Sequence, residues 1–357
     1  MSQINQLILR EFRCFQELRY EPAPGLNFIT GPNARGKTSI LEAACFLMRL
    51  RSPRTSALGE MVRFGEASFL IEGLVKSEEE TRLGVTCTPP ARALKLDGVP
   101  QSSSTEYLKL GTIVWFGSDD LFVVNGPAER RRKLLDSAGL QTGGSSRSYA
   151  RDLRDYDRAL RARNLLLREG RSRREIEAYD HPLAETGDRI LGFRHDLIAR
   201  LAPLVSDACR KISGETLEIS YEPGAARAMM ESLLSSRDEE LRLRQTRVGP
   251  QRDDLKLLLN GIPAGSFASE GQRRTIALAL KLAVAALLNL ENGRPPLLLL
   301  DDIFGELDPS RRDALLIGMP AGAQALLSTA ELTGISIPTG SRIHRFSTNG
   351  TLEMVSP

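Results

Sequence analysis

The chain has 357 residues, which is long for one compact domain and sufficient for two domains with a sizeable core. Its 48 basic and 45 acidic residues give a formal charge of +3, too small by itself to indicate a nucleic-acid-binding protein. The four cysteines form no CxxC pair and the three histidines lie far apart, so neither a disulfide framework nor a zinc site is expected.

The first third of the chain alternates short apolar segments with turns. Strands are expected at residues 4–12, 26–29, 69–75, 82–87 and 112–116. A helix is expected at 40–50, and Asp97-Gly98 indicates a hairpin turn. The amino terminus is charged and polar where a signal peptide would be apolar, and the longest apolar stretch, 275–290, is too short to span a membrane. We therefore expect a cytoplasmic protein without a membrane segment.

The sequence GPNARGKT, which follows the second expected strand, fits the phosphate-binding pattern G-x-x-x-x-G-K-[ST]. Its glycines would let backbone N–H groups surround phosphates, and the N-terminus of the next helix would add its dipole. Lys37 is expected to reach the β- and γ-phosphates of a nucleotide, and Thr38 to bind Mg²⁺. The expected nucleotide-binding residues are Gly31, Pro32, Asn33, Ala34, Arg35, Gly36, Lys37, Thr38 and Ser39.

The sequence changes character near Pro127, where strand signals nearly disappear and Arg, Leu and Asp become frequent. A roughly heptad spacing predicts one helix with a buried face formed by Tyr149, Leu153, Tyr156, Leu160 and Leu167. A second helix is expected at 190–208, with Pro203 bending or dividing it. Together these helices predict an antiparallel helical lobe at 126–214, inserted into the first domain.

Arginines recur along the first of these helices, on the face opposite its apolar residues. They are Arg147, Arg151, Arg154, Arg158 and Arg161. One interpretation is a row of phosphate contacts along DNA, and the other is a solvated face with Asp–Arg pairs. The run Arg130-Arg131-Arg132 leaves the same two alternatives open. Because no base-reading motif is evident, DNA binding by Arg130, Arg131, Arg132, Arg151, Arg154 and Arg158 would be independent of sequence.

Strand signals return at 217–221 and 255–261, and a third strand is expected in the unbroken apolar run Leu297–Leu300. A run without alternation suits a strand covered on both faces, as in a parallel sheet. Asp301-Asp302 ends this run, at the sheet edge where ligands bind. Alone the two acids would fit a simple turn. Together with the phosphate loop they predict catalysis by Lys37, Asp301 and Asp302, with Asp301 holding Mg²⁺ and Asp302 polarising the attacking water.

Residues 268–276 read ASEGQRRTI and open a long apolar helix. Ser269 is expected to cap a helix beginning at Gly271 or Gln272, and Gly271 would let an anion approach the backbone. A plain capped core helix is the alternative. The stretch is similar to the signature motif of ABC-type ATPases, which contacts the nucleotide held by the opposite subunit. The similarity implies a head-to-tail homodimer around two ATP molecules, with Ser269, Glu270, Gly271, Gln272 and Asp308 at its seam.

Several further blocks, in the same order, resemble the RecF family. They are LREFRCFQELRYEPAPGLNFITGPNARGKTSILEA, SPRTS, WFGSDDLFVVNGPAERRRKLLD, TRVGPQRDDL, SEGQRRT and LLLLDDIFGELDPSRR. The resemblance implies an α/β fold: an ABC-ATPase head with a mixed sheet and flanking helices, formed by residues 1–125 and 215–357, plus the mainly helical lobe. It implies a weak, DNA-stimulated ATPase that uses ATP and Mg²⁺ and acts as an ATP-driven clamp on DNA in recombinational gap repair. The implied partners are double-stranded DNA, single-strand/double-strand junctions, RecR, RecO and RecA.

Three positions depart from the family pattern. Glu270 stands where Gln or Gly is usual, Gln251 where His is common, and the segment Ser328–Glu331 where many ABC proteins have a switch histidine. In that segment Thr329 or Glu331 is a weak candidate for activating water. Asp302, shorter than the glutamate of transporters, implies slow hydrolysis. Another SMC-like ABC ATPase with a DNA-tethering or structural role is the alternative, whereas a transporter ATPase is disfavoured by the Arg-rich lobe between the two motifs.

Overall fold

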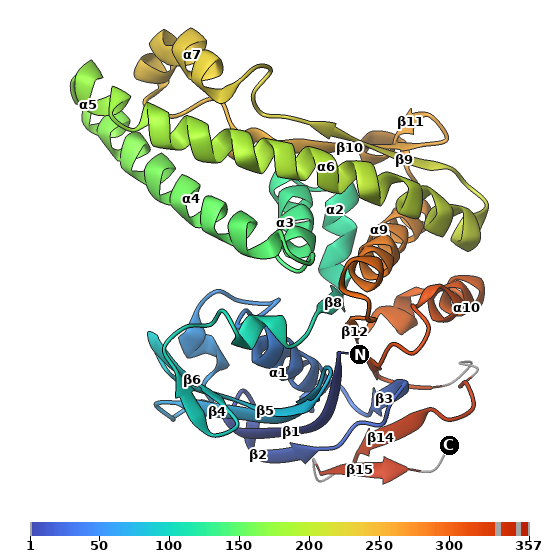
Figure 1. Ribbon diagram of the computed structural model, residues 1–357. Helices are drawn as coiled ribbons and strands as arrows, with labels where there is room; N and C mark the ends of the chain where they lie inside the picture. Colours follow the sequence, from blue (N-terminus) through green and yellow to red (C-terminus); the bar gives the residue numbers. More distant parts are fainter. Residues whose placement is uncertain (1, 333–336, 348–350, 356–357) are drawn as a thin grey trace. The chain divides into compact units, whose positions relative to one another are not determined.

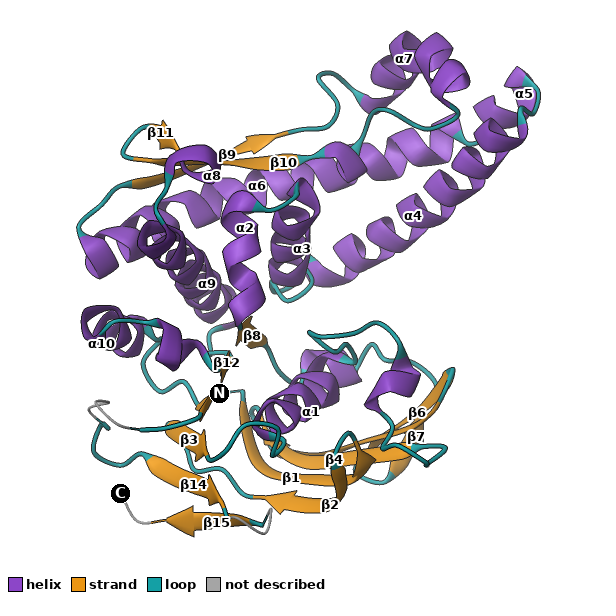
Figure 2. Ribbon diagram, turned by 180° about the vertical axis from the view of Figure 1, so that it is seen from behind, coloured by secondary structure: helices purple, strands orange, loops and turns teal. Residues whose placement is uncertain are grey.

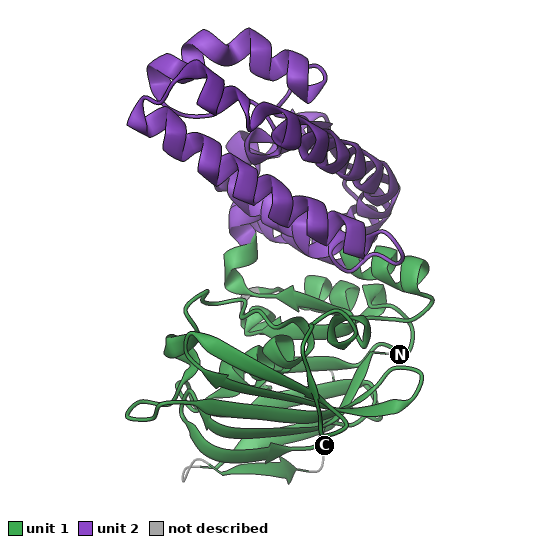
Figure 3. Cartoon of the chain, turned by 60° about the vertical axis from the view of Figure 1, so that its left-hand side comes forward, with its two compact units in different colours: residues 1–120, 284–357 green, residues 121–283 purple. Residues whose placement is uncertain are grey.

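The computed structural model describes residues 2–332, 337–347 and 351–355. It contains two compact units (Figure 3): unit 1 comprises residues 1–120 and 284–357, and unit 2 comprises residues 121–283. The sequence assigned residues 215–283 to the head, but the structure groups them with the helical lobe. The second long helix is α6 (Asp180–Ser213), and the next strand, β9 (Leu217–Glu222), packs along it.

Unit 1 contains two six-stranded sheets. The first is antiparallel, in the strand order β2-β1-β4-β5-β6-β7 (Figure 1). Its strands are β1 (Gln3–Phe12), β2 (Phe15–Tyr20), β4 (Phe69–Lys76), β5 (Glu80–Thr88), β6 (Ala91–Leu96) and β7 (Val99–Gln101). Residues of β4 alternate between buried and partly exposed, as expected when one face packs on the core. Asp97 and Gly98 form the expected hairpin turn, with φ values of 48° and 81°.

The second sheet has the order β15-β14-β3-β13-β12-β8 and is parallel except for its edge strand β15. Its strands are β3 (Leu26–Thr30), β8 (Ile113–Phe116), β12 (Leu297–Asp301), β13 (Ala325–Thr329), β14 (Arg342–Phe346) and β15 (Leu352–Val355). Leu297–Leu300 are completely buried, which confirms that this strand is covered on both faces. Helix α1 (Lys37–Arg49) contacts strands of both sheets, so nearly all its residues lie in the core.

Unit 2 is mainly helical, with a small antiparallel sheet in the order β11-β10-β9. Its elements besides α6 and β9 are α2 (Phe122–Asn125), α3 (Ala128–Gly139), α4 (Ser146–Glu169), α5 (Arg173–Glu177), α7 (Met229–Leu243), β10 (Asp254–Leu259), β11 (Ile262–Pro263) and α8 (Ala264–Phe267). Helices α4 and α6 run side by side and antiparallel in Figures 1 and 2, as expected. Pro203 does not divide α6, which is continuous from Asp180 to Ser213.

Helix α9 (Glu270–Asn292) includes residues of both units, because the division between them falls at residue 283. Among the described residues it is the one helix whose length and mean hydropathy (1.4) would suit a membrane span. However, 67% of its most apolar window is buried inside the fold. Burial of this kind is found in core helices of globular proteins, which pass the same test.

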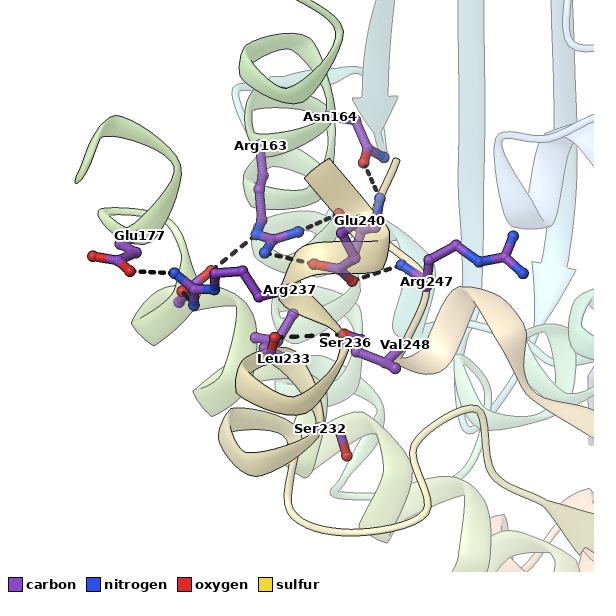
Figure 4. Close-up of polar contacts among 12 residues, drawn as sticks. Arg163, Asn164, Glu177, Ser232, Leu233, Ser236, Arg237, Glu240, Arg247 and Val248 are labelled. Atoms are coloured by element: carbon purple, nitrogen blue, oxygen red, sulfur yellow. Dashed lines mark hydrogen bonds and ion pairs between the residues drawn. The ribbon is translucent and has the colours of Figure 1, made fainter. Parts of the chain in front are cut away.

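A buried cluster of charges joins α4, α5, α6 and α7 in unit 2 (Figure 4). Arg163, completely buried, pairs with Asp180 at 2.9 Å and with Glu240 at 2.7 Å, and donates to the Thr246 hydroxyl at 2.8 Å. Arg237 of α7 pairs with Asp180 as well. From the sequence alone, Arg163 could not be distinguished from the other basic residues of the lobe. In the fold it is neutralised and inaccessible, so it is not part of any exposed basic surface.

Removal of one member of this cluster is expected to destabilise unit 2 strongly. Arg163→Ala would leave the buried carboxylate of Glu240 without its arginine partner and that of Asp180 with Arg237 alone, at a cost of about 3–5 kcal/mol. Arg161→Ala on the same helix is the matched control, since Arg161 is 74% exposed and its pair with Asp157 is worth less than about 1 kcal/mol. Urea unfolding followed by far-UV circular dichroism measures both. Equal losses for the two variants would contradict a structural role of the cluster.

Candidate nucleotide-binding site

The phosphate loop connects β3 to α1 and depends on two glycines. Gly31 and Gly36 have φ values of 134° and 98°, a region that side chains rarely tolerate. A Cβ atom at Gly36 would lie 2.4 Å from the Phe15 ring and 2.7 Å from the Cys14 sulfur. At Gly31 it would lie 2.9 Å from Cβ of Phe346. The loop therefore packs tightly against neighbouring strands, and its glycines are required by space as well as by conformation.

Lys37 is buried and folds back over this loop. Its Nζ donates to the carbonyl oxygens of Gly31 at 2.6 Å and Pro32 at 3.0 Å. Burial lowers the pKa of Lys37, while the nearby carboxylates of Asp302 and Asp301 raise it. The ammonium group is thus held inside the curve of the loop, where the sequence predicted a phosphate contact.

The two expected magnesium ligands come together although they are far apart in the sequence. Thr38 Oγ1 donates to Asp301 Oδ1 at 2.7 Å. Ser328, opposite Asp301 in the β12–β13 register, also donates to Oδ1 at 2.8 Å and accepts from the Asp302 N–H at 2.9 Å. Burial raises the pKa of Asp301, and the hydrogen bonds from Thr38 and Ser328 lower it. A hydroxyl and a carboxylate are hard oxygen donors of the kind Mg²⁺ binds beside phosphates, so the residues present fit this ion.

A cleft of about 880 Å³ opens beside the loop. It is lined by residues of the loop, by Asp302 and Ser328, and by Arg13 and Arg54. Phe64 lies on its rim with its ring completely exposed. No motif in the sequence indicated a role for Arg13, Arg54 or Phe64. Arg54 lies in the block SPRTS, which carried the family resemblance, but nothing in its local pattern indicated that it lines the cleft.

In the switch segment, Ser328 is the residue that contacts the acidic pair. The activation of water by Thr329 or Glu331 stays a prediction. The Thr329 hydroxyl instead donates to the Glu331 carbonyl oxygen at 2.9 Å. Gln251, which stands where the family has His, belongs to unit 2, where it accepts from the Tyr156 hydroxyl.

The signature stretch forms the N-terminus of α9 in unit 2. The Gln272 N–H donates to Ser269 Oγ at 3.3 Å, and the Ser269 N–H donates to Gln272 Oε1 at 3.0 Å, so the two residues form a reciprocal capping box. The helix begins at Glu270, one or two residues before the expected start, and Glu270 pairs with Arg274 at 2.7 Å. Ser269 and Glu270 are exposed. Because the cap uses a lone pair of Oγ, the hydroxyl hydrogen of Ser269 remains able to donate.

Asp308, the other expected seam residue, belongs to unit 1 and caps α10 (Pro309–Gly318). Its Oδ1 accepts from the Arg311 N–H at 3.0 Å, and it also pairs with the Arg311 side chain. These contacts hold the pKa of Asp308 below its usual range, the backbone hydrogen bond contributing most. The carboxylate is therefore ionised at neutral pH while it caps the helix.

The structure separates the candidate DNA-binding arginines into two groups. Arg151, Arg154 and Arg158 are exposed on α4, as expected, with Arg158 3.9 Å from Asp155. In contrast, Arg131 holds both carboxylate oxygens of Asp254, at 2.5 and 3.0 Å. Two further members of the run are similarly engaged: Arg132 donates to the Asp253 carbonyl oxygen at 2.7 Å, and the Arg130 guanidinium lies 5.8 Å from the centre of the Phe122 ring. For Arg131 and Arg132 these contacts favour the structural interpretation.

The chain is similar to known proteins over nearly its whole length. Residues 3–326 match the family model described as the RecF/RecN/SMC N terminal domain. The chain is 39% identical to a protein of Anaeromyxobacter sp. (strain Fw109-5), over 98% of each chain, and 38% identical to one of Moorella thermoacetica, over 92% of this chain and 90% of the relative. Both relatives are named DNA replication and repair protein RecF.

Among solved structures, one described as the recombination mediator protein RecF-ATP in the RecFOR pathway superposes with a TM-score of 0.90. It is 30% identical to this chain and covers 99% of it, with 98% of its own length matched. An SMC head bound to the C-winged helix domain of ScpA superposes with a TM-score of 0.58 at 15% identity, which shows a shared fold. The fold is therefore that of an ABC-type ATPase head with mixed α/β content.

Proposed function

The chain belongs to the RecF family of SMC-like ABC ATPases, and on that premise we propose that it is an ATP-dependent DNA-binding protein of recombinational gap repair. The observation that carries the proposal is the contact between Thr38 and Asp301, which joins the phosphate loop to the acidic end of β12. A phosphate loop and an acid at this distance are the minimal parts of a nucleotide-hydrolysing site. The solved relative described with ATP supports the choice of nucleotide.

In the proposed site, the backbone from Gly31 to Ser39 surrounds the phosphates and Lys37 neutralises them. Thr38 and Asp301 would hold Mg²⁺, which would supply positive charge beside the phosphates. Asp302 orients the attacking water, and its short side chain fits a slow turnover. The exposed ring of Phe64 offers an aromatic face to the base at the rim of the cleft.

ATP also joins two chains in this proposal. Ser269, Glu270, Gly271 and Gln272 of one chain contact the nucleotide held by a second chain, with Asp308 at the same seam. The exposed N-terminus of α9 supports this assignment, because its free N–H groups and its dipole favour an anion. The hydroxyl hydrogen that the Ser269 cap leaves available adds a donor for a phosphate oxygen.

The DNA-binding part of the proposal rests on the exposed arginines of α4. Arg151, Arg154 and Arg158 would contact phosphates of double-stranded DNA and of single-strand/double-strand junctions, without reading the bases. Arg130 is retained as a further contact, whereas the intramolecular contacts of Arg131 and Arg132 make them weaker candidates. The description of the solved relative as part of the RecFOR pathway supports cooperation with RecO and RecR. Action on RecA through these partners, and a cytoplasmic location, are further parts of the proposal.

Sedimentation velocity of the full-length chain tests this function. We expect a monomer alone, a dimer with ATP and Mg²⁺, and a larger complex when gapped duplex DNA is added. Reversing the charges of Arg151, Arg154 and Arg158 to Glu should leave the dimer intact, weaken DNA binding and reduce its salt dependence. Reversing the exposed Arg10 and Arg19 of unit 1 is the control. A chain that stays monomeric with ATP, or a salt dependence that the α4 variant shares with the wild type, would contradict the proposal.

A further inference from the structure

Glu42 is a completely buried carboxylate on α1, one turn beyond the phosphate loop. Its two oxygens accept hydrogen bonds from three side chains. Arg13 donates to both, at 2.6 and 2.9 Å, Ser52 donates at 2.5 Å, and Arg54 donates at 3.3 Å. No part of the expected nucleotide chemistry uses this carboxylate, yet both of its arginines line the cleft.

The two arginines are held very unequally. Arg13 is 18% exposed, makes a bidentate pair with Glu42 and also donates to the Glu60 carbonyl oxygen at 2.5 Å. Arg54 is 47% exposed and reaches Glu42 through one nitrogen, at a distance beyond the usual 2.7–2.9 Å of a charge-assisted hydrogen bond. Arg13 therefore neutralises the buried carboxylate by itself, and Arg54 can leave it without stranding an unpaired buried charge.

Arg54 also lines the same cleft as Lys37, Thr38 and Asp302. A guanidinium in this position faces the cleft in which the nucleotide phosphates are proposed to lie, and phosphate oxygens are among its best partners.

We propose that Glu42 is a positioning residue that holds Arg54 at the edge of the cleft and competes with the nucleotide phosphates for its guanidinium. This inference rests on the proposed nucleotide site. Binding of ATP transfers Arg54 from the carboxylate to a phosphate, while Arg13 stays in place. The affinity for ATP is then lower than it would be with Arg54 free, by the factor that the competing contact imposes.

Replacement of Glu42 by glutamine tests the competition, because it keeps the size of the side chain and removes its charge. With the full-length chain and Mg²⁺, we expect Glu42→Gln to tighten ATP binding several-fold in calorimetric titration. The gain should vanish when Arg54→Ala is present in both proteins being compared. A residue that merely supports the fold would weaken binding with or without Arg54, and that result would overturn the proposal.

Glu60→Gln controls for the general effect of one less negative charge, since Glu60 is an exposed acid lining the same cleft. Its effect on ATP affinity should be the same with and without Arg54. If Glu42→Gln fails to fold, Glu42→Asp serves instead: its retracted carboxylate should lose the long contact to Arg54 first and again tighten binding. A wild-type chain that binds no ATP would refute the proposed function. Wild-type ATP binding that neither variant tightens would refute only the role of Glu42.

Discussion

The Lys37→Ala variant is expected to bind ATP about 100-fold more weakly than the wild-type chain. The ammonium group is already fixed inside the loop by the carbonyl oxygens of Gly31 and Pro32, so it meets the phosphates without further ordering. Hydrogen bonds to charged groups contribute about 1.5–3 kcal/mol each, and loss of one or two of them corresponds to a factor of this size. Calorimetric or fluorescence titration of the purified chain with ATP and Mg²⁺ measures the change.

Two further variants show which property of Lys37 accounts for the lost ATP affinity. Lys95→Ala removes an exposed lysine of unit 1 and should leave ATP affinity within a factor of two. Lys37→Arg keeps the positive charge but replaces a compact ammonium by a planar group that the tight loop cannot accommodate, so it should recover little of the affinity. Full affinity in Lys37→Ala would show that the loop does not bind phosphates.

The second large effect is expected at Ser269. Ser269→Asp should leave the chain monomeric in ATP and Mg²⁺, with a dimer dissociation constant at least about 100-fold higher than that of the wild type. Asp caps a helix about as well as Ser, so the start of α9 should be preserved. The new carboxylate would however face the phosphates of the nucleotide on the opposite chain, where like charges repel and a donor has been lost. Sedimentation velocity over a range of protein concentrations measures the constant.

Ser148→Asp is the matched control, because Ser148 is an exposed serine of unit 2 outside the signature stretch. It should dimerise like the wild type. Thermal unfolding of Ser269→Asp should also match the wild type, which separates a lost contact between chains from a damaged helix. A Ser269→Asp protein that dimerises with wild-type affinity would show that the signature stretch is only a helix cap.

The parts of the site that could be predicted from sequence are those encoded locally. The phosphate loop occupies eight consecutive residues, and the strand that ends in Asp301 is marked by four consecutive leucines. Because parallel strands end at one edge of a sheet, the approach of Thr38 to Asp301 follows from the two motifs together. The start of α9 was predicted to within one or two residues for the same reason: its capping residues are neighbours in the chain.

The parts that could not be predicted depend on partners far apart in the sequence. Arg131 and Arg151 look alike as exposed basic residues of a helical lobe, yet Arg131 pairs with Asp254, 123 positions away. Glu42 meets Arg13 and Arg54 only after β1, α1 and the segment beyond it have come together. The boundary of the lobe was misplaced because β9 and β10 have ordinary strand patterns, and only their packing on α6 and α3 shows which unit they join.

The reciprocal cap at the start of α9 has a consequence for the rate at which two chains would associate. The backbone N–H groups of Ser269 and Gln272 each donate to the other residue's side chain. This part of the proposed dimer interface is therefore ordered before a second chain binds. Ordering a flexible side chain at an interface costs about 0.5–1.5 kcal/mol of conformational entropy. At the start of α9 these side chains are already ordered in the folded monomer. Association would then need no rearrangement at this surface, and the lifetime of the pair would be set by how long each chain retains its ATP.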